Sequence, residues 1–428
     1  MIAHLSILRR PRITLNLSRR DSEHLLGLQR RKATSYGRLG MVSALSDHLW
    51  MIAGVVVVAS ICGRVVVMKS LLRRRPAASS LSHPTFYRSR GRILVPLIIM
   101  LPLLGCAAAP AGSGDLAEPG TMWILVAILG FMMPIGVMLV AWGGADWEQM
   151  SSIASAGLLA LFLAIVGYSA TGFALQFGGI GWSHDLAGIE GLAAPFVSAS
   201  RDTAGLFGTR GFFLSGDAAG PGARYLFLSH LPWVMTAVLV PTIGLQRHAP
   251  GWVRALVGLL VSALAYPLLA NWSWAGGPTA VTAEAGGWLG NLGVNAGLGH
   301  GFIDFGGAGT VHLMGGAISL AGIFLLGTRK PAGDPSVPPA IPPVHLPMLA
   351  VLGLLLWAVG WIAATLAHPL YAGGSVPWSA VALNALAGLT AGATFSQFYA
   401  WFTTGQADAL MAARGGAAGL VATTAAAP

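Results

Sequence analysis

The sequence predicts an all-α fold, a polytopic transmembrane helical bundle in a lipid bilayer. Hydrophobic residues make up 55% of its 428 residues and charged residues only 9%, against about 25% charged residues in an ordinary soluble domain. Glycine occurs 58 times, nearly twice its usual share of about 7%, and small residues let helices pack closely in lipid. Several apolar runs are long enough to cross roughly 30 Å of hydrocarbon. These observations exclude an ordinary soluble protein.

Residues 1–92 form a basic N-terminal extension. They contain 17 Lys and Arg against three acidic residues, whereas the rest of the chain contains eight against 12. Because the basicity is confined to the extension, we expect no nucleic-acid partner for the main body. The extension is either disordered and cytoplasmic or the product of a start codon placed too far upstream. Within it, the apolar run 49–68 contains Arg64. This run either crosses the membrane or only resembles a membrane span.

Residues 93–106 resemble a secretory signal peptide. Arginines at alternating positions precede the apolar core I-L-V-P-L-I-I-M-L-P-L-L-G-C, and small residues follow it. We expect the mature protein to begin near Ala107. Acylation of Cys106, as in a lipoprotein, is the alternative. The chain has only two cysteines, which excludes a disulfide framework and a cysteine metal site.

Eight apolar runs of membrane-spanning length follow, so residues 122–428 are expected to form the membrane domain. The eighth is rich in alanine and glycine and would be a weak span alone. The runs are 122–143, 152–177, 224–245, 252–272, 308–327, 345–367, 379–402 and 409–426.

The charges of the short loops predict how these spans are oriented. Basic residues occur in 247–254, in 329–345 and at Arg414, three places separated by pairs of spans, whereas 273–307 and 368–378 contain no Lys or Arg. By the positive-inside rule, the mature N-terminus lies outside and the loops at 247–254 and 329–345 are cytoplasmic. The chain is therefore expected to be a multi-pass protein of the cell membrane.

His312 lies about one turn into the fifth run, where an ionisable side chain is costly and usually functional. It is either hydrogen-bonded to a neighbouring helix or part of the wall of a path through the membrane. A neutral imidazole offers one donor and one acceptor. It therefore suits a small polar molecule without requiring a permanent ion.

Two further candidates stand at the ends of spans. Asp304 precedes the fifth run, and its carboxylate either caps that helix or orients backbone around a cation site, two compatible roles. Trp274 ends the fourth run and belongs either to the interfacial aromatic belt or to a vestibule where its ring binds a cation. His230 and His368 lie near outer helix ends and are additional candidates for contact with a substrate.

The sequence motifs of ordinary enzymes are missing. The chain has no phosphate-binding G-x-x-x-x-G-K-S/T loop, no H-E-x-x-H metal helix and no G-x-S-x-G nucleophile turn. We therefore expect no enzymatic activity, no cofactor, no metal site and no ATP-driven transport by this chain alone.

The stretch D-F-G-G-A-G-T-V-H, which begins at Asp304, resembles the signature D-F-A-G-G-T-V-V-H of the ammonium transporter and Rhesus protein (Amt/Rh) family. The aspartate and the histidine are eight residues apart in both. G-Y-S-A-T-G-F-A-L-Q-F-G at 167–178 and N-W-S-W-A-G-G at 271–277 resemble the family's G-Y-S-L-A-F-G and V-W-G-G-G in the same order. The resemblance covers roughly residues 122–428.

This resemblance implies eleven helices around one pore per subunit, two inverted five-helix repeats and a homotrimer. Ammonium would be recruited at an outer aromatic cage and cross beside two histidines. His312 would be the first pore histidine, Asp304 the buried carboxylate that supports cation recruitment, and Trp274 the cage tryptophan. Ammonium or ammonia is the expected substrate, and a regulatory protein on the cytoplasmic side is a further expected partner.

Several positions depart from the family pattern. The phenylalanines of the third-helix gate fall at Leu228 and Pro232, and Trp233 is the only aromatic residue close by. On the sixth run, Ala364 stands where the family has the second gate phenylalanine, and His368 where it has the vestibule serine. The outer vestibule is therefore expected to differ from that of the family.

The sequence ends at Pro428 after about eight of the family's eleven helices, so we expect an incomplete second inverted repeat, truncated before the last three helices. Transport of ammonium or ammonia through a histidine-lined pore is the leading hypothesis. The alternatives are a non-conducting ammonium sensor or regulatory relative, or an incomplete inactive fragment. A third class is an unrelated membrane enzyme or permease that uses His312 and Asp304.

Overall fold

The computed structural model describes residues 120–145, 150–182, 188–196, 205–274, 287–295, 301–327, 345–369 and 376–425. The predicted extension at 1–92, with its apolar run, and the signal-like segment at 93–106 lie outside these residues.

Seven helical stretches in this part of the chain are long and apolar enough to cross a membrane, which confirms the predicted all-α transmembrane bundle. They coincide with the first seven predicted runs. The eighth run forms α15, a 16-residue helix shorter than the others. The stretches are α3–α4 (Thr121–Leu129 and Met132–Gly143), α5–η3–α6–η4 (Met150–Gly167, Tyr168–Gly172, Phe173–Phe177 and Ile180–Trp182), α7 (Pro221–Gly244), α8–η7–α9 (Gly251–Leu260, Val261–Ala265 and Tyr266–Trp274), η8–α11 (Ala308–Leu313 and Met314–Leu326), α12 (His345–Ala367) and α14 (Trp378–Thr404), followed by α15 (Ala409–Thr424).

The remaining described elements are short and lie in the connections. A two-residue antiparallel pair, β1 (Pro195–Phe196) with β2 (Phe207–Gly208), precedes two 3₁₀ turns, η5 (Phe212–Leu214) and η6 (Gly216–Ala219). Helix α10 (Trp288–Asn295) follows the fourth span.

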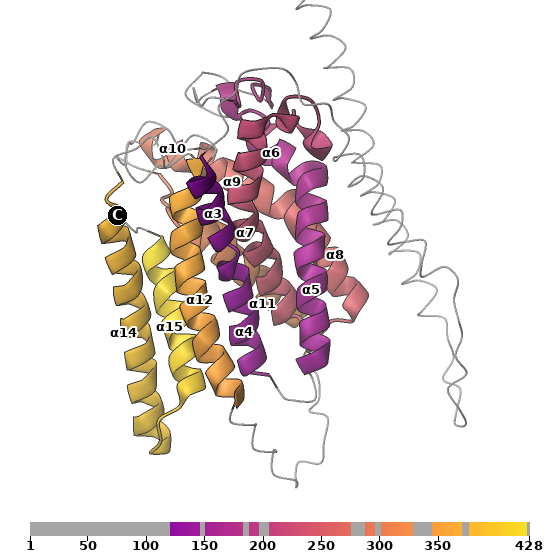
Figure 1. Ribbon diagram of the computed structural model, residues 1–428. Coiled ribbons are helices and arrows are strands. Elements are labelled where there is room, and N and C mark those ends of the chain that lie inside the picture. The colour runs from indigo at the N-terminus through magenta and orange to yellow at the C-terminus, as the bar shows by residue number, and fades with distance from the viewer. Residues whose placement is uncertain are drawn as a thin grey trace, which may run out of the picture. The chain divides into compact units, whose positions relative to one another are not determined.

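Helix α7 is the centre of the bundle. It is the most buried of the seven spans and contacts α4, α5, α8, α11 and α12. Figure 1 shows α14 and α15 at one side of the bundle and α5 and α8 at the opposite side. The buried polar side chains of α7 therefore lie among several other spans and away from lipid.

Three spans pass through a π-helical turn, a rare element that is frequent at functional sites. These turns are η3, η7 and η8. η3 and η7 pack together, and Thr171 donates a hydrogen bond to the carbonyl oxygen of Ala263 across the contact (2.8 Å). The extra residue in each turn changes the direction in which the neighbouring side chains point. Tyr168 lies within η3, and Tyr266 directly follows η7.

Helices α14 and α15 pack through glycine. Gly388 and Gly392 on α14 face Gly415 and Gly419 on α15, and a Cβ at any of these positions would meet backbone or side-chain atoms of the facing helix. In lipid, such small residues let backbones approach closely. This contact explains how a short helix rich in alanine and glycine is held in the bundle.

Gly419→Ala is therefore expected to lower the free energy of unfolding by about 1–3 kcal/mol, because the new methyl group would overlap the backbone of Gly388. Thermal unfolding of the purified protein in detergent measures the change. The matched control is Gly316→Ala on α11, where a Cβ would meet no atom within 4 Å. Equal midpoints for the two variants would contradict the packing.

Candidate functional site

The loop between α10 and η8 is anchored to two spans through its carbonyl oxygens. The indole N–H of Trp274, at the end of α9, donates to the carbonyl oxygen of Asp304 (2.5 Å). The indole N–H of Trp361, on α12, donates to the carbonyl oxygen of Gly306 (2.9 Å). These two tryptophans fix the position of the loop between the fourth and sixth spans.

The carboxyl end of α15 holds the same loop from a third direction. The backbone N–H of Phe305 donates to the carbonyl oxygen of Ala425 (2.9 Å), and that of Gly306 to the carbonyl oxygen of Thr424 (2.7 Å). A Cβ at Gly306 would overlap the Trp361 ring and Thr424. The loop approaches α12 and α15 so closely that only glycine fits at this position.

Asp304 organises the start of η8. Its side chain is buried, with 1% of the residue exposed. The carboxylate accepts hydrogen bonds from the backbone N–H groups of Gly309 (3.1 Å) and Thr310 (2.7 Å) and from the Thr310 hydroxyl (2.8 Å). Burial raises the pKa of Asp304, and the bonds from Thr310 and Gly309 act in the opposite direction. These bonds confirm the predicted capping role, while a role in binding a substrate stays a prediction.

His312 lies on η8, eight residues after Asp304. Its backbone N–H donates to the carbonyl oxygen of Gly307 (3.2 Å), five residues back, as a π-turn requires. The imidazole is half-buried and packs on Trp357 of α12, with ring centroids 5.3 Å apart. Within the part of the chain that the structure describes, the imidazole makes no hydrogen bond, so the predicted bond to a neighbouring helix is not observed there.

Trp274 is buried among other aromatic rings, not exposed at a helix end. Its ring lies edge-on to His230, with centroids 5.6 Å apart, and to Trp233 at 5.9 Å. Trp233 in turn lies over Gly307, which adopts a left-handed conformation with φ of 78°. The indole N–H of Trp233 is buried and has no acceptor among the described residues.

The centre of this aromatic group is a buried pair of histidines. His230 Nδ1 lies 2.9 Å from His368 Nε2, although the two residues are 138 positions apart in the chain. His230 Nε2 lies 2.6 Å from the Tyr266 hydroxyl and 2.8 Å from Gln176 Nε2. Both imidazoles are buried. Three spans thus converge on His230, and α12 ends at its partner.

The tautomer of His230 follows from the orientation of the Gln176 amide. With Gln176 Oε1 accepting from the Tyr168 hydroxyl (2.9 Å), the amide nitrogen faces His230 and can only donate. His230 Nε2 is then an acceptor, and the proton on Nδ1 is donated to His368 Nε2. The result is a chain of neutral donors and acceptors inside the bundle.

The structure brings Trp274, Asp304, Trp233 and His368 into one connected region, and η8 joins His312 to it through Asp304. Ala364 is buried and faces Gly130, at the break between α3 and α4.

Sequence reasoning missed the pairing of His230 with His368 and the contributions of Tyr168, Gln176 and Tyr266. A usable signal existed. All five are polar residues that lie in, or directly after, one half of their spans, and the charges of the loops place these halves on the same side of the membrane.

Comparison with known proteins identifies relatives of this chain. Residues 121–428 match the family model described as the Ammonium Transporter Family. The chain is 28% identical over 344 residues to "Ammonium transporter Amt2" of Archaeoglobus fulgidus, an alignment that covers 78% of this chain and 66% of the relative. It is 28% identical over 318 residues to "Ammonium transporter Amt1" of Haloferax mediterranei, covering 72% and 56%. The chain therefore spans less than two thirds of the length of these curated relatives.

Solved structures share the fold. A structure titled "Sensor Amt Protein" superposes with a TM-score of 0.53 at 22% identity, covering 71% of this chain and 67% of that one. The crystal structure of Candida albicans Mep2 gives a TM-score of 0.50 at 22% identity, covering 72% and 60%.

Proposed function

From the premise that the chain belongs to the ammonium transporter family, we propose that it moves ammonium or ammonia across the membrane along a path that begins beside Trp274 and passes His312. The chain is a multi-pass membrane protein. The curated relatives above carry the name ammonium transporter. The proposal extends that activity to this chain.

One observation carries the proposal. Trp274 is bound to the loop of Asp304 through its N–H and lies edge-on to the neutral His230–His368 pair. Neutral imidazoles in an apolar bundle can form hydrogen bonds with a small polar molecule. They do so without the free-energy cost of burying a permanent ion. The indole ring of a tryptophan such as Trp274 also attracts a cation through its quadrupole. The indole ring would therefore recruit ammonium, and the neutral imidazoles would form hydrogen bonds with ammonia as it passes.

His312→Ala is expected to lower the flux of ammonium or methylammonium by roughly tenfold, because a lost hydrogen bond of about 1–1.5 kcal/mol in the rate-limiting passage changes a rate by that factor. Uptake by proteoliposomes that contain equal amounts of inserted protein measures it. Leu313→Ala is the matched control, because Leu313 is its neighbour on η8 and is 69% exposed.

Unchanged uptake in His312→Ala would remove this histidine from the path. Saturable ammonium binding without flux in the wild-type protein would instead favour the non-conducting sensor. Activity as an enzyme is not expected, because the relatives above are named as transporters.

We further propose that the protein resides in the cell membrane as a homotrimer, with the mature N-terminus outside after removal of a signal peptide near 93–106. The basic residues at 247–254 and at Arg414 support this orientation. Loops on their side, including 329–345, would be cytoplasmic and available to a regulatory protein.

A further inference from the structure

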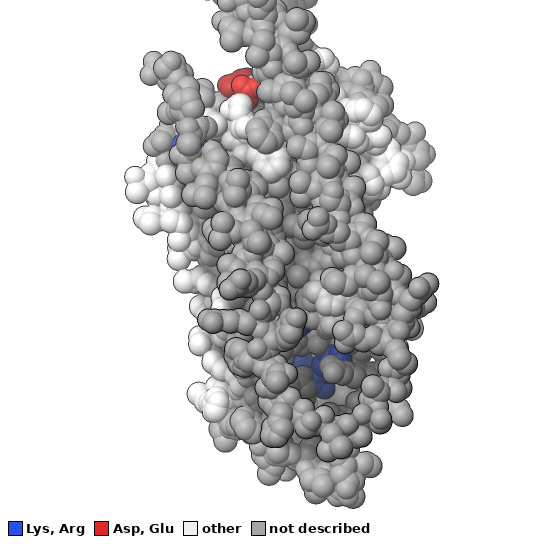
Figure 2. All heavy atoms as spheres, turned by 90° about the vertical axis from the view of Figure 1, so that its right-hand side faces the viewer, with Lys and Arg blue, Asp and Glu red and all other residues white. Residues whose placement is uncertain are grey.

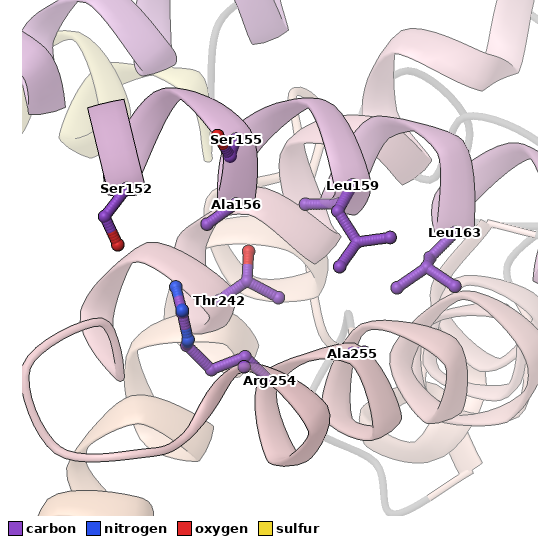
Figure 3. A pocket seen from close by; sticks show the side chains of 10 residues that line it. Ser152, Ser155, Ala156, Leu159, Leu163, Thr242, Arg254 and Ala255 are labelled. Atoms are coloured by element: carbon purple, nitrogen blue, oxygen red, sulfur yellow. The ribbon is translucent and has the colours of Figure 1, made fainter. Parts of the chain in front are cut away.

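A cavity of about 220 Å³ lies between α5, α7 and α8, at the end of the bundle opposite to the histidine pair along these helices. Arg254 and Ser152 line its polar end, and Leu159 and Leu163 its apolar end (Figure 3). Arg254 belongs to the first turn of α8 and Ser152 to the first turn of α5. The polar end therefore lies where two spans begin, at the depth expected for lipid headgroups.

The guanidinium of Arg254 has buried donors without acceptors. Its Nε and Nη1 are inaccessible to solvent and have no hydrogen-bond partner among the described residues. Among the described residues, an ion pair joins Arg210 to Asp217, and it lies at the other end of the bundle. In Figure 2, which faces this side, the larger group of visible basic atoms lies in the lower half, and the visible acidic atoms lie near the opposite end. Arg254 as a whole is half-buried, but its two buried donors without acceptors cost free energy, and an anionic partner would satisfy them.

The two orphan donors indicate a partner with several oxygens. Nη1 lies on the Cδ side of the guanidinium and the Nε hydrogen points to the other side, so each donor needs an acceptor of its own, as the oxygens of a phosphate or carboxylate group provide. Ser152 adds a third donor, because its oxygen already accepts from Gln246 Nε2 (2.8 Å) and its own hydrogen remains to be donated. Figure 3 shows the Arg254 side chain directed across the cavity toward α5 and Ser152.

The apolar end of the cavity fits a ligand with an apolar tail. Leu163 lies eleven residues beyond Ser152 on α5, about 16 Å along the helix axis at 1.5 Å per residue. Leu159, between them on α5, is 42% exposed. A free phosphate ion would contact only the polar end, whereas an acyl chain would cover both leucines.

We propose that this cavity binds an anionic phospholipid, with its phosphodiester on Arg254 and Ser152 and an acyl chain along Leu159 and Leu163. The site belongs to the leaflet on the basic side of the bundle, where Arg247 and Arg414 also lie. It is separate from the region around Trp274 and does not depend on the transport proposal.

The test uses the purified full chain and native mass spectrometry with phosphatidylglycerol, phosphatidylcholine of the same acyl chains, and inorganic phosphate. The wild-type protein should retain phosphatidylglycerol preferentially, and Arg254→Gln should lose about tenfold in affinity for it, as expected for the loss of charge-assisted hydrogen bonds. Arg224→Gln is the matched control, because it removes the same charge from an exposed position on α7.

A second variant keeps the test decisive if Arg254→Gln folds poorly. Leu159→Trp fills the apolar end and should weaken binding of long-chain phosphatidylglycerol while leaving a short-chain analogue unaffected. Equal retention of phosphatidylglycerol by the wild-type protein, Arg254→Gln and Leu159→Trp would overturn the proposal. So would competition by inorganic phosphate at the same concentration as the lipid, or a subunit contact that fills the cavity in the assembled protein.

Discussion

Asp304→Ala is expected to lower the free energy of unfolding by about 2–6 kcal/mol, because one buried and one partly buried N–H group lose their acceptor at about 1–3 kcal/mol each. These are the N–H groups of Gly309 and Thr310 in the first turn of η8. Because η8 carries His312, uptake should fall together with stability. Denaturation of the purified protein in a detergent titration measures the first effect, and proteoliposome uptake the second.

Asp304→Asn separates the cap from the charge. An asparagine keeps one oxygen, so it preserves either the bond from Gly309 or the bonds from Thr310, and its stability should lie between those of the wild type and Asp304→Ala. Thr310→Val is the control that removes only the hydroxyl donor. If correctly assembled Asp304→Asn protein transports at the wild-type rate, the carboxylate charge has no role in recruiting ammonium.

His230→Leu is expected to have the second largest effect. It would leave the buried amide nitrogen of Gln176 without its acceptor, at about 1–3 kcal/mol. It would also remove one hydrogen bond from the Tyr266 hydroxyl and one from His368 Nε2. Uptake should fall as well, because the pair lies directly beside Trp274. Unfolding and uptake are measured as for Asp304.

Tyr266→Phe is the matched control for His230→Leu, since it removes one hydroxyl from the same cluster and keeps the ring. A double-mutant cycle of His230→Leu with His368→Leu should be non-additive, because the two imidazoles share a hydrogen bond. Additive losses in stability, or uptake that is unchanged in both single variants, would contradict the pair's proposed position on the path.

The spans could be predicted because apolar length is a local property of the sequence. The first run, 122–143, and the sixth, 345–367, agree with the observed spans within one residue at each end. The π-turns could not be predicted, because the apolar runs that contain η3 and η7 carry no periodic mark of an extra residue. The break at Gly130 between α3 and α4 likewise lies within an unbroken apolar run.

Parts of the site could be predicted for a similar reason. Asp304 and His312 are close in sequence, so their relation through one helix start was readable. The His230–His368 bond joins residues 138 positions apart, and no local pattern encodes which spans are neighbours. The replacement of the family's vestibule serine by His368 was visible, but its bonded partner on α7 was not.

The attachment of the Asp304 loop to the end of α15 has a consequence for biosynthesis. The acceptors of Phe305 and Gly306 are the carbonyl groups of Ala425 and Thr424, which the ribosome adds about 120 residues after Asp304. At about 5–20 residues per second, roughly 6 to 24 seconds pass before they exist. During that interval water or another temporary partner must accept hydrogen bonds from those amides, so the Asp304 loop reaches its final hydrogen bonding only after α15 has been made.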